Sequence, residues 1–127
     1  MLDWLRRNLR LQTFLVNSAP ARDNHVLVTT CFSEARGSIK NLDLAVGAED
    51  IYYAALKDLA RQVFTYLGQL KDAVKLKRLF LVGGGAKDPL LLPMIARSAE
   101  LEVIAPDINE AAARGAALLA IRYLEAK

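Results

Sequence analysis

The spacing of apolar residues predicts alternating helices and strands along the chain. Apolar residues that recur every three or four positions predict helices over residues 2–10, 48–70, 89–99 and 110–124. Runs rich in β-branched and apolar residues predict strands at 25–32, 79–82 and 101–104, with a weaker one at 38–44. A polar loop is expected at 17–24, which contains Pro20. Strand and helix alternate in the second half, a pattern typical of an α/β unit with a parallel sheet.

The helix expected at 48–70 is the longest in the chain. Glu49 and Asp50 lie in its first turn, where carboxylates interact favourably with the helix dipole. Arg61 lies off the apolar stripe, and Gly68 near the end suggests fraying or a close contact. The residues of the stripe, which should face the core, are Tyr52, Leu56, Leu59, Val63, Tyr66, Leu67 and Leu70.

The last expected helix has small side chains nearly all round. Asn109 or Asp107 is expected to cap it. Gly115 costs about 1 kcal/mol of helix propensity relative to alanine, so we expect another backbone to pack closely against it. The small residues are Ala111, Ala112, Ala113, Gly115, Ala116, Ala117 and Ala120.

The segment LFLVGGGAKDP, residues 79–89, joins a buried strand to a helix through three glycines. Gly83, Gly84 and Gly85 lack a β-carbon, so the backbone can turn sharply and a ligand can lie against it. Asp88 suits the N-cap and Pro89 the first helical position. The spacing fits neither the Walker A loop nor the dinucleotide fingerprint. The motif alone favours equally an anion or nucleotide site and a tight connection without a ligand.

Composition narrows the classes of protein that the chain can belong to. Its 127 residues, 54% of them hydrophobic, suit one domain with a real core. No apolar run approaches the ~20 residues of a membrane span, and the N-terminus does not resemble a signal peptide. A single cysteine, Cys31, excludes an internal disulfide framework; we expect it in the core and the protein in a reducing cytoplasm.

Charge and metal-binding residues add little. The formal net charge of +3 is mild, and the densest basic stretch has no interleaved aromatic residues, so nucleic acid is not an expected partner. That stretch comprises Lys71, Lys75, Lys77 and Arg78. His25 is the only histidine, which makes a zinc site improbable.

Two motifs at their proper separation resemble the C-terminal signature of the FGGY carbohydrate kinases, such as xylulokinase and glycerol kinase. The first is the Gly-Gly-Gly-Ala turn at residues 83–86. The second is Glu-x-x-Ala-x-Gly-Ala-Ala in the last helix, which matches Glu110, Ala113, Gly115, Ala116 and Ala117. Between them lie a helix and a short strand that ends at Pro106. The resemblance extends over roughly residues 26–124.

The resemblance implies the actin-like ATPase fold, related to ribonuclease H, here as a partial C-terminal domain with a short mixed sheet packed with helices. It also implies a nucleotide site for ATP or ADP, used with magnesium by the family. Gly83, Gly84, Gly85 and Ala86 would lie against adenosine or the α-phosphate, and Asp88 would lie beside them. Asp88 departs from the Ser or Asn that the family often carries there, and capping alone could explain the carboxylate.

The family has two domains, and residues 1–127 resemble only the C-terminal part of such a kinase as a single domain. The catalytic aspartate and the first phosphate loop belong to the family's N-terminal domain and have no counterpart here. Since phosphoryl transfer needs several such parts, the chain should not catalyse by itself.

Three hypotheses therefore remain. The chain could be the adenosine-binding portion of a sugar or polyol kinase that pairs with the missing N-terminal domain. It could be a non-catalytic interaction module, a homodimer through the helix that contains Gly115. A stand-alone enzyme would need a site among the carboxylates of Asp43, Asp88, Asp107 and Glu110, which show no supporting base, nucleophile or metal spacing.

Overall fold

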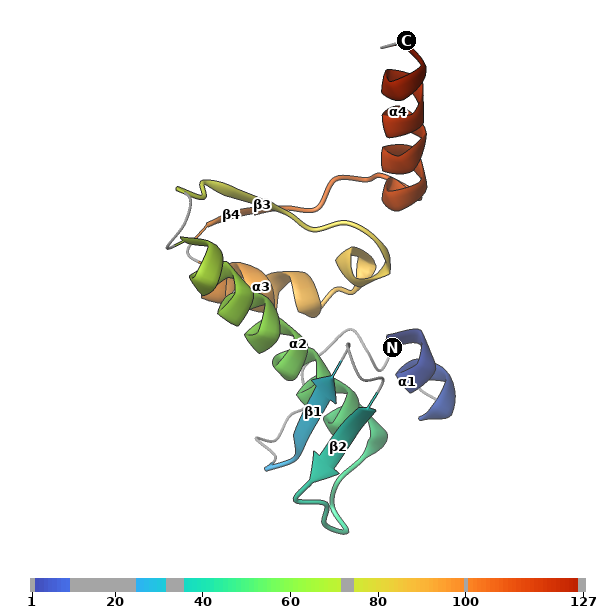
Figure 1. Ribbon diagram of the computed structural model, residues 1–127. Coiled ribbons are helices and arrows are strands. Elements are labelled where there is room, and N and C mark those ends of the chain that lie inside the picture. The colour runs from blue at the N-terminus through green and yellow to red at the C-terminus, as the bar shows by residue number, and fades with distance from the viewer. Residues whose placement is uncertain (1, 10–24, 32–35, 72–74, 100, 126–127) are drawn as a thin grey trace.

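The computed structural model describes residues 2–9, 25–31, 36–71, 75–99 and 101–125. The helices and strands follow the predicted order, and their bounds differ from the predicted ones by a few residues. The loop expected at 17–24, Phe32 and the side chain of Cys31 lie outside the described part. The elements are α1 (Leu2–Asn8), β1 (Leu27–Cys31), β2 (Arg36–Lys40), α2 (Ala48–Lys71), β3 (Arg78–Phe80), η2 (Gly84–Lys87), α3 (Leu91–Ala99), β4 (Glu102–Ile104) and α4 (Ala111–Glu125) (Figure 1).

The strands form two separate pairs instead of the expected single mixed sheet. β1 and β2 are antiparallel, with Leu27 opposite Lys40. β3 and β4 are parallel and joined through α3, as the alternation of the second half predicts, with Leu79 opposite Val103. β2 begins before the predicted strand because Gly37 allows close pairing. A β-carbon there would lie only 2.9 Å from the carbonyl oxygen of Thr29.

The core lies where α2 meets α1, α3 and β1. Its centre is the apolar stripe of α2, where Ala55 and Leu56 are completely buried. Leu5 from α1 completes the cluster, together with Leu91 and Ile95 from α3. Trp4, next to Leu5 in α1, is 59% exposed and lies outside this cluster.

Two residues of the expected apolar stripe of α2 do not face the core. Leu67 is buried, but Tyr66 and Leu70 are more than half exposed, so the prediction that they face the core is wrong. Leu67, next to Tyr66 in the sequence, is only 6% exposed, so the core still reaches this turn of α2. Tyr66 and Leu70 therefore lie on sides of the helix that face away from the core.

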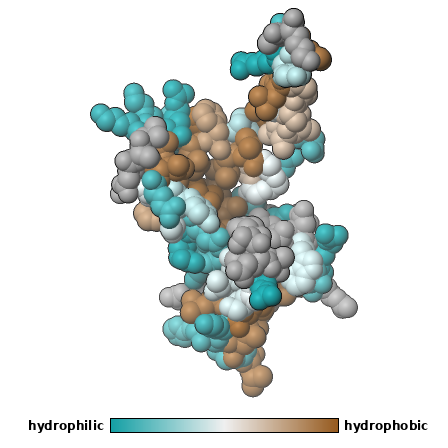
Figure 2. All heavy atoms as spheres, in the orientation of Figure 1, coloured by the Kyte–Doolittle hydropathy of each residue, from teal (hydrophilic) through white to brown (hydrophobic). Residues whose placement is uncertain are grey.

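The last helix, α4, projects away from the other elements (Figure 1), and none of its residues is buried. Gly115 has no packing partner, because a β-carbon there would meet no atom within 4 Å. Figure 2 shows apolar residues on α4 and nearby over β3 and β4. The exposed ones include Phe80, Val82, Leu118, Leu119, Ile121, Tyr123 and Leu124. The expected close packing against Gly115 is therefore absent within the described residues.

The start of α4 differs from the predicted cap. Glu110, with a positive φ of 51°, occupies the cap position, and its carbonyl oxygen accepts a hydrogen bond from the amide of Arg114. Asn109 is one position too early to cap, and its side-chain oxygen accepts a hydrogen bond from Lys87 Nζ at 2.9 Å. The prediction of Asn109 or Asp107 as the cap is therefore wrong.

Across the described helices, none is long and apolar enough to span a membrane.

Candidate functional site

The three glycines turn the chain sharply after β3. Gly83 has φ 87° and ψ −169°, a conformation that is open essentially to glycine alone. The short 3₁₀-helix η2 follows directly. The amide of Ala86 donates to the carbonyl oxygen of Gly83 at 3.1 Å, and that of Asp88 donates to the carbonyl oxygen of Gly85 at 3.2 Å. The predicted sharp turn is confirmed, and it is wound into a helical turn.

The three glycines differ in what requires them. Gly83 is required by its backbone conformation. A β-carbon on Gly85 would lie 3.4 Å from Cδ2 of Leu91, so this glycine sits directly against α3. Gly84 has no such reason: its φ is outside the left-handed region, and a β-carbon would meet no atom within 4 Å. The outer face of the turn is therefore open at Gly83 and Gly84.

As predicted, the side chain of Asp88 caps the segment that leads into α3, whose first residue is Leu91. Its Oδ1 accepts hydrogen bonds from the amides of Leu90 at 2.9 Å and Leu91 at 3.1 Å, which is the geometry of an N-cap. Its Oδ2 accepts from the hydroxyl of Tyr52 at 2.6 Å and from Nη2 of Arg6 at 2.9 Å. The residue is only 1% exposed. One carboxylate therefore joins α1, α2 and the start of α3.

The electrostatics of this cluster keep Tyr52 protonated. Burial raises the pKa of Tyr52, and the hydrogen bond to Asp88 and its negative charge raise it further. The nearby charge of Arg6 and its hydrogen bond act in the opposite direction but are outweighed. The guanidinium carbon of Arg6 lies 5.7 Å from the centre of the Tyr52 ring, so the cation also packs on the aromatic face. The arrangement anchors a buried carboxylate.

These contacts bear on the predicted nucleotide site. Gly83, Gly84, Gly85 and Ala86 lie together on the turn, as the sequence requires. Both oxygens of Asp88 have protein partners, which gives this residue a demonstrated anchoring role. Direct contact between Asp88 and a nucleotide stays a prediction.

The other candidate carboxylates are not gathered around Asp88. Asp43 Oδ1 accepts from the amide of Ala45 at 2.7 Å in an exposed turn. Asp107 and Glu110 are exposed on the approach to α4. In the part of the chain that the structure describes, no group of three His, Cys, Asp or Glu side chains could hold a metal ion. The structure therefore adds no support to a stand-alone enzyme built on these residues.

Sequence reasoning missed Arg6 and Tyr52 as partners of Asp88. Tyr52 was visible only as a member of the apolar stripe. Arg6 is 82 positions from Asp88, and no local pattern links the two residues. A buried N-cap carboxylate needs a compensating cation, which would have been the one usable signal, but burial of Asp88 was not evident from sequence.

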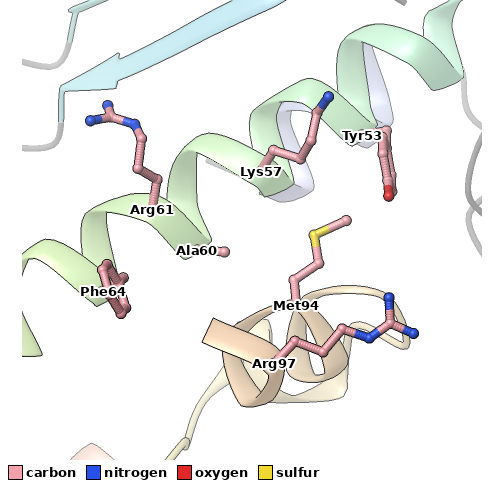
Figure 3. Close-up of a pocket in the computed structure, with 7 residues that line it drawn as sticks. All are labelled: Tyr53, Lys57, Ala60, Arg61, Phe64, Met94 and Arg97. Carbon is pink, nitrogen blue, oxygen red and sulfur yellow. The ribbon is translucent and has the colours of Figure 1, made fainter. Parts of the chain in front are cut away.

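A hollow lies between α2 and α3 (Figure 3), with a volume of about 560 Å³. None of its lining residues belongs to the glycine turn. Tyr53, Lys57, Ala60, Arg61 and Phe64 come from α2, and Met94 and Arg97 come from α3.

Comparison with known proteins identifies the class. The sequence pattern described as "FGGY family of carbohydrate kinases, C-terminal domain" matches residues 2–124. Since this covers nearly the whole chain, the protein belongs to the FGGY carbohydrate kinase family, in which it corresponds to the C-terminal domain.

Individual relatives agree with this assignment. A glycerol kinase from Borrelia hermsii is 35% identical over 89 residues, which cover 68% of this chain and 18% of that protein. One from Shewanella baltica is 33% identical over 135 residues, covering 94% of this chain and 27% of that protein. The chain thus spans about a fifth to a quarter of the length of these relatives.

Solved structures show the same fold. A xylulose kinase from Rhodospirillum rubrum superposes with a TM-score of 0.67 at 19% identity, covering 84% of this chain and 25% of that one. A kinase described as "xyloylose kinase", from Brucella ovis, gives the same TM-score at 20% identity, with 86% and 25% covered. The actin-like ATPase fold expected from the sequence is confirmed.

Proposed function

We propose that the chain forms the nucleotide-binding part of an ATP-dependent carbohydrate kinase. In this proposal the turn from Gly83 to Ala86 lies against the adenosine or the α-phosphate of ATP or ADP. The observation that carries it is Gly84, an exposed glycine for which nothing inside the described protein requires the absence of a β-carbon. A ligand that lies directly on the backbone at this position would require a residue without a β-carbon.

The residues of the turn fit a nucleotide through their backbone and shape. The positive φ of Gly83 fixes the direction of the turn, and Asp88 holds the turn to α1, α2 and α3 from inside. We assign Asp88 this supporting role in the nucleotide site. Magnesium, which is commonly bound through phosphate oxygens together with one or two carboxylates, would be supplied with the nucleotide.

Binding is tested by calorimetry with ADP and magnesium, supported by NMR mapping of the amides that shift. We expect millimolar affinity with shifts centred on residues 83–86, since a single wall of a cleft makes few contacts. Gly84→Ala should weaken binding at least about fivefold, because its methyl group enters the space of the ligand. Gly68→Ala is the matched control: Gly68 is also exposed, and a β-carbon there also meets nothing within 4 Å. No heat at millimolar ADP would count against the proposal.

We also propose that phosphoryl transfer requires a further protein region, of the kind found in the part of the related kinases that this chain does not match. The exposed apolar residues of α4 are the surface that such a region would cover. The purified chain should not phosphorylate glycerol, xylulose or other polyols and sugars with ATP. Turnover by the chain alone would show that it contains the catalytic groups.

The second candidate is a homodimer through α4. It is favoured by the open space at Gly115, where another backbone could approach closely, and by the apolar residues of the same helix. In that case the chain would be an interaction module derived from the kinase fold.

A further inference from the structure

The hollow between α2 and α3 has an apolar floor. Ala60 is buried, and Met94 reaches from α3 toward the facing side of α2 (Figure 3). Tyr53 and Phe64 stand further along α2 on either side of Ala60, and Phe64 remains 48% exposed. The volume of the hollow, about 560 Å³, falls in the range of small-molecule sites, roughly 300–1,000 Å³.

The polar side chains that line the hollow are positively charged, apart from the Tyr53 hydroxyl. They are Lys57, Arg61 and Arg97, and none of the described residues that line the hollow carries a carboxylate. Arg61 is paired with Asp58, with 2.6 Å between Nη2 and Oδ1, so its charge is compensated and its stem serves as wall. Lys57 and Arg97 therefore determine the charge of the hollow.

Lys57 and Tyr53 form a local unit. Lys57 Nζ lies 5.5 Å from the centre of the Tyr53 ring, a cation–π distance. The ring thus holds the ammonium at the edge of the hollow. Arg97 lies on the opposite helix, where its planar guanidinium can bind an oxyanion through two hydrogen bonds and can also stack on a ring.

We propose that this hollow binds a small organic anion whose phosphate or carboxylate is carried on a flat apolar ring. The ring would lie over Ala60 and Met94, bordered by Tyr53 or Phe64. The anionic head would be held by the guanidinium of Arg97, and Lys57 would add positive charge at the edge of the hollow. This site is distinct from the glycine turn, so the proposal does not depend on nucleotide binding there.

The test is an NMR titration of the ¹⁵N-labelled chain with phenyl phosphate and, separately, with benzoate. Stronger binding of one shows whether the hollow prefers a phosphate or a carboxylate head. We expect millimolar affinity, typical of such small ligands, with shifts confined to residues 53–64 and 94–97. Inorganic phosphate and benzyl alcohol, which carry only the head or only the ring, should each bind at least about tenfold more weakly because each lacks half of the contacts.

Two exposed substitutions test the assigned roles. Arg97→Gln should weaken phenyl phosphate at least about fivefold by removing a charge-assisted contact, and Phe64→Ala should weaken it by removing an aromatic wall. Arg122→Gln is the matched control, because Arg122, like Arg97, is an exposed arginine in the last turn of a helix, but it lies away from the hollow. Equal binding of inorganic phosphate, scattered shifts, or equal effects of the two arginine substitutions would overturn the proposal.

The same variants separate this site from the nucleotide site. Arg97→Gln should leave the affinity for ADP unchanged, and Gly84→Ala should leave that for phenyl phosphate unchanged. If phenyl phosphate shifts the amides of residues 83–86 instead, the hollow is not the site and the proposal is wrong, whatever the outcome with ADP.

Discussion

Asp88 combines a local role with a long-range one. The local role, capping α3, follows from the order Asp-Pro at the start of an apolar period and could be predicted from the sequence. The long-range role could not, because it depends on how α1 and α2 approach the turn in three dimensions. The same limit applies to Gly84: the sequence shows three glycines, and only the structure separates the one required by its φ from the one without an internal reason.

The hydrogen bond from Tyr52 to Asp88 should matter for stability. Tyr52→Phe leaves a buried carboxylate with one donor fewer, and we expect the free energy of unfolding to fall by about 1.5–3 kcal/mol. Tyr66→Phe is the control, because Tyr66 is 62% exposed; its effect should stay within about 0.5 kcal/mol. Urea denaturation measures both, and equal values for the two variants would contradict the anchoring role.

At the scale of elements, periodicity predicted the order of helices and strands and the parallel pairing of β3 with β4. It did not predict how far each element is covered. Tyr66 was assigned to the apolar stripe of α2 but is 62% exposed, whereas the adjacent Leu67 is buried. The apolar period does not show how wide a face of the helix the neighbouring elements cover. The division of the strands into two pairs could not be predicted either, because it depends on how the elements pack in three dimensions.

Asp58 links α2 to β1 and should make their contact sensitive to acid. Its Oδ2 accepts hydrogen bonds at 2.8 Å from both the amide and the hydroxyl of Thr30. Burial acts to raise the pKa of Asp58, but hydrogen bonds from Arg61, Thr30 and Gln62 outweigh it and lower the pKa below its usual value. The stabilisation is therefore complete above the pKa of the unfolded chain, about 3.9, and is lost as pH falls through the lower pKa of the folded state.

Comparison of Asp58→Asn with the natural chain isolates this effect. At neutral pH the variant should be less stable by about 1.5–3 kcal/mol, the range for hydrogen bonds to a charged group. The difference should shrink as the pH falls below about 4, since the natural carboxylate then becomes protonated. Denaturation curves across that range measure it, and a difference independent of pH would refute the assignment.

At the scale of the molecule, the distribution of apolar surface is unusual for a domain that is complete by itself. α4 exposes Leu118, Leu119 and Leu124 by more than 60% each, and large exposed apolar areas commonly mark interaction sites. The chain spans about a fifth to a quarter of the length of the glycerol kinases it matches. The small residues of α4 suggested a close contact with another backbone, but the sequence could not show that no described residue packs against Gly115.

The oligomeric state decides between the two occupants of this surface. If α4 pairs with a second copy, light scattering at high concentration should give the mass of a dimer. Gly115→Leu should then shift the equilibrium toward monomer by blocking close approach, whereas Gly68→Leu, a matched change in the exposed part of α2, should not. A monomer at high concentration would exclude the homodimer and leave a separate kinase region as the proposed partner.

The bond between Arg6 and Asp88 also has a consequence for the order of folding. The two residues are separated by 82 positions. At a synthesis rate of about 5–20 residues per second, Arg6 is made roughly 4–16 s before its partner. Since helix formation takes about a microsecond or less, α1 can form and dissolve many times during that delay. We therefore expect α1 to dock late, when the turn after β3 has been made and the carboxylate that holds it is in place.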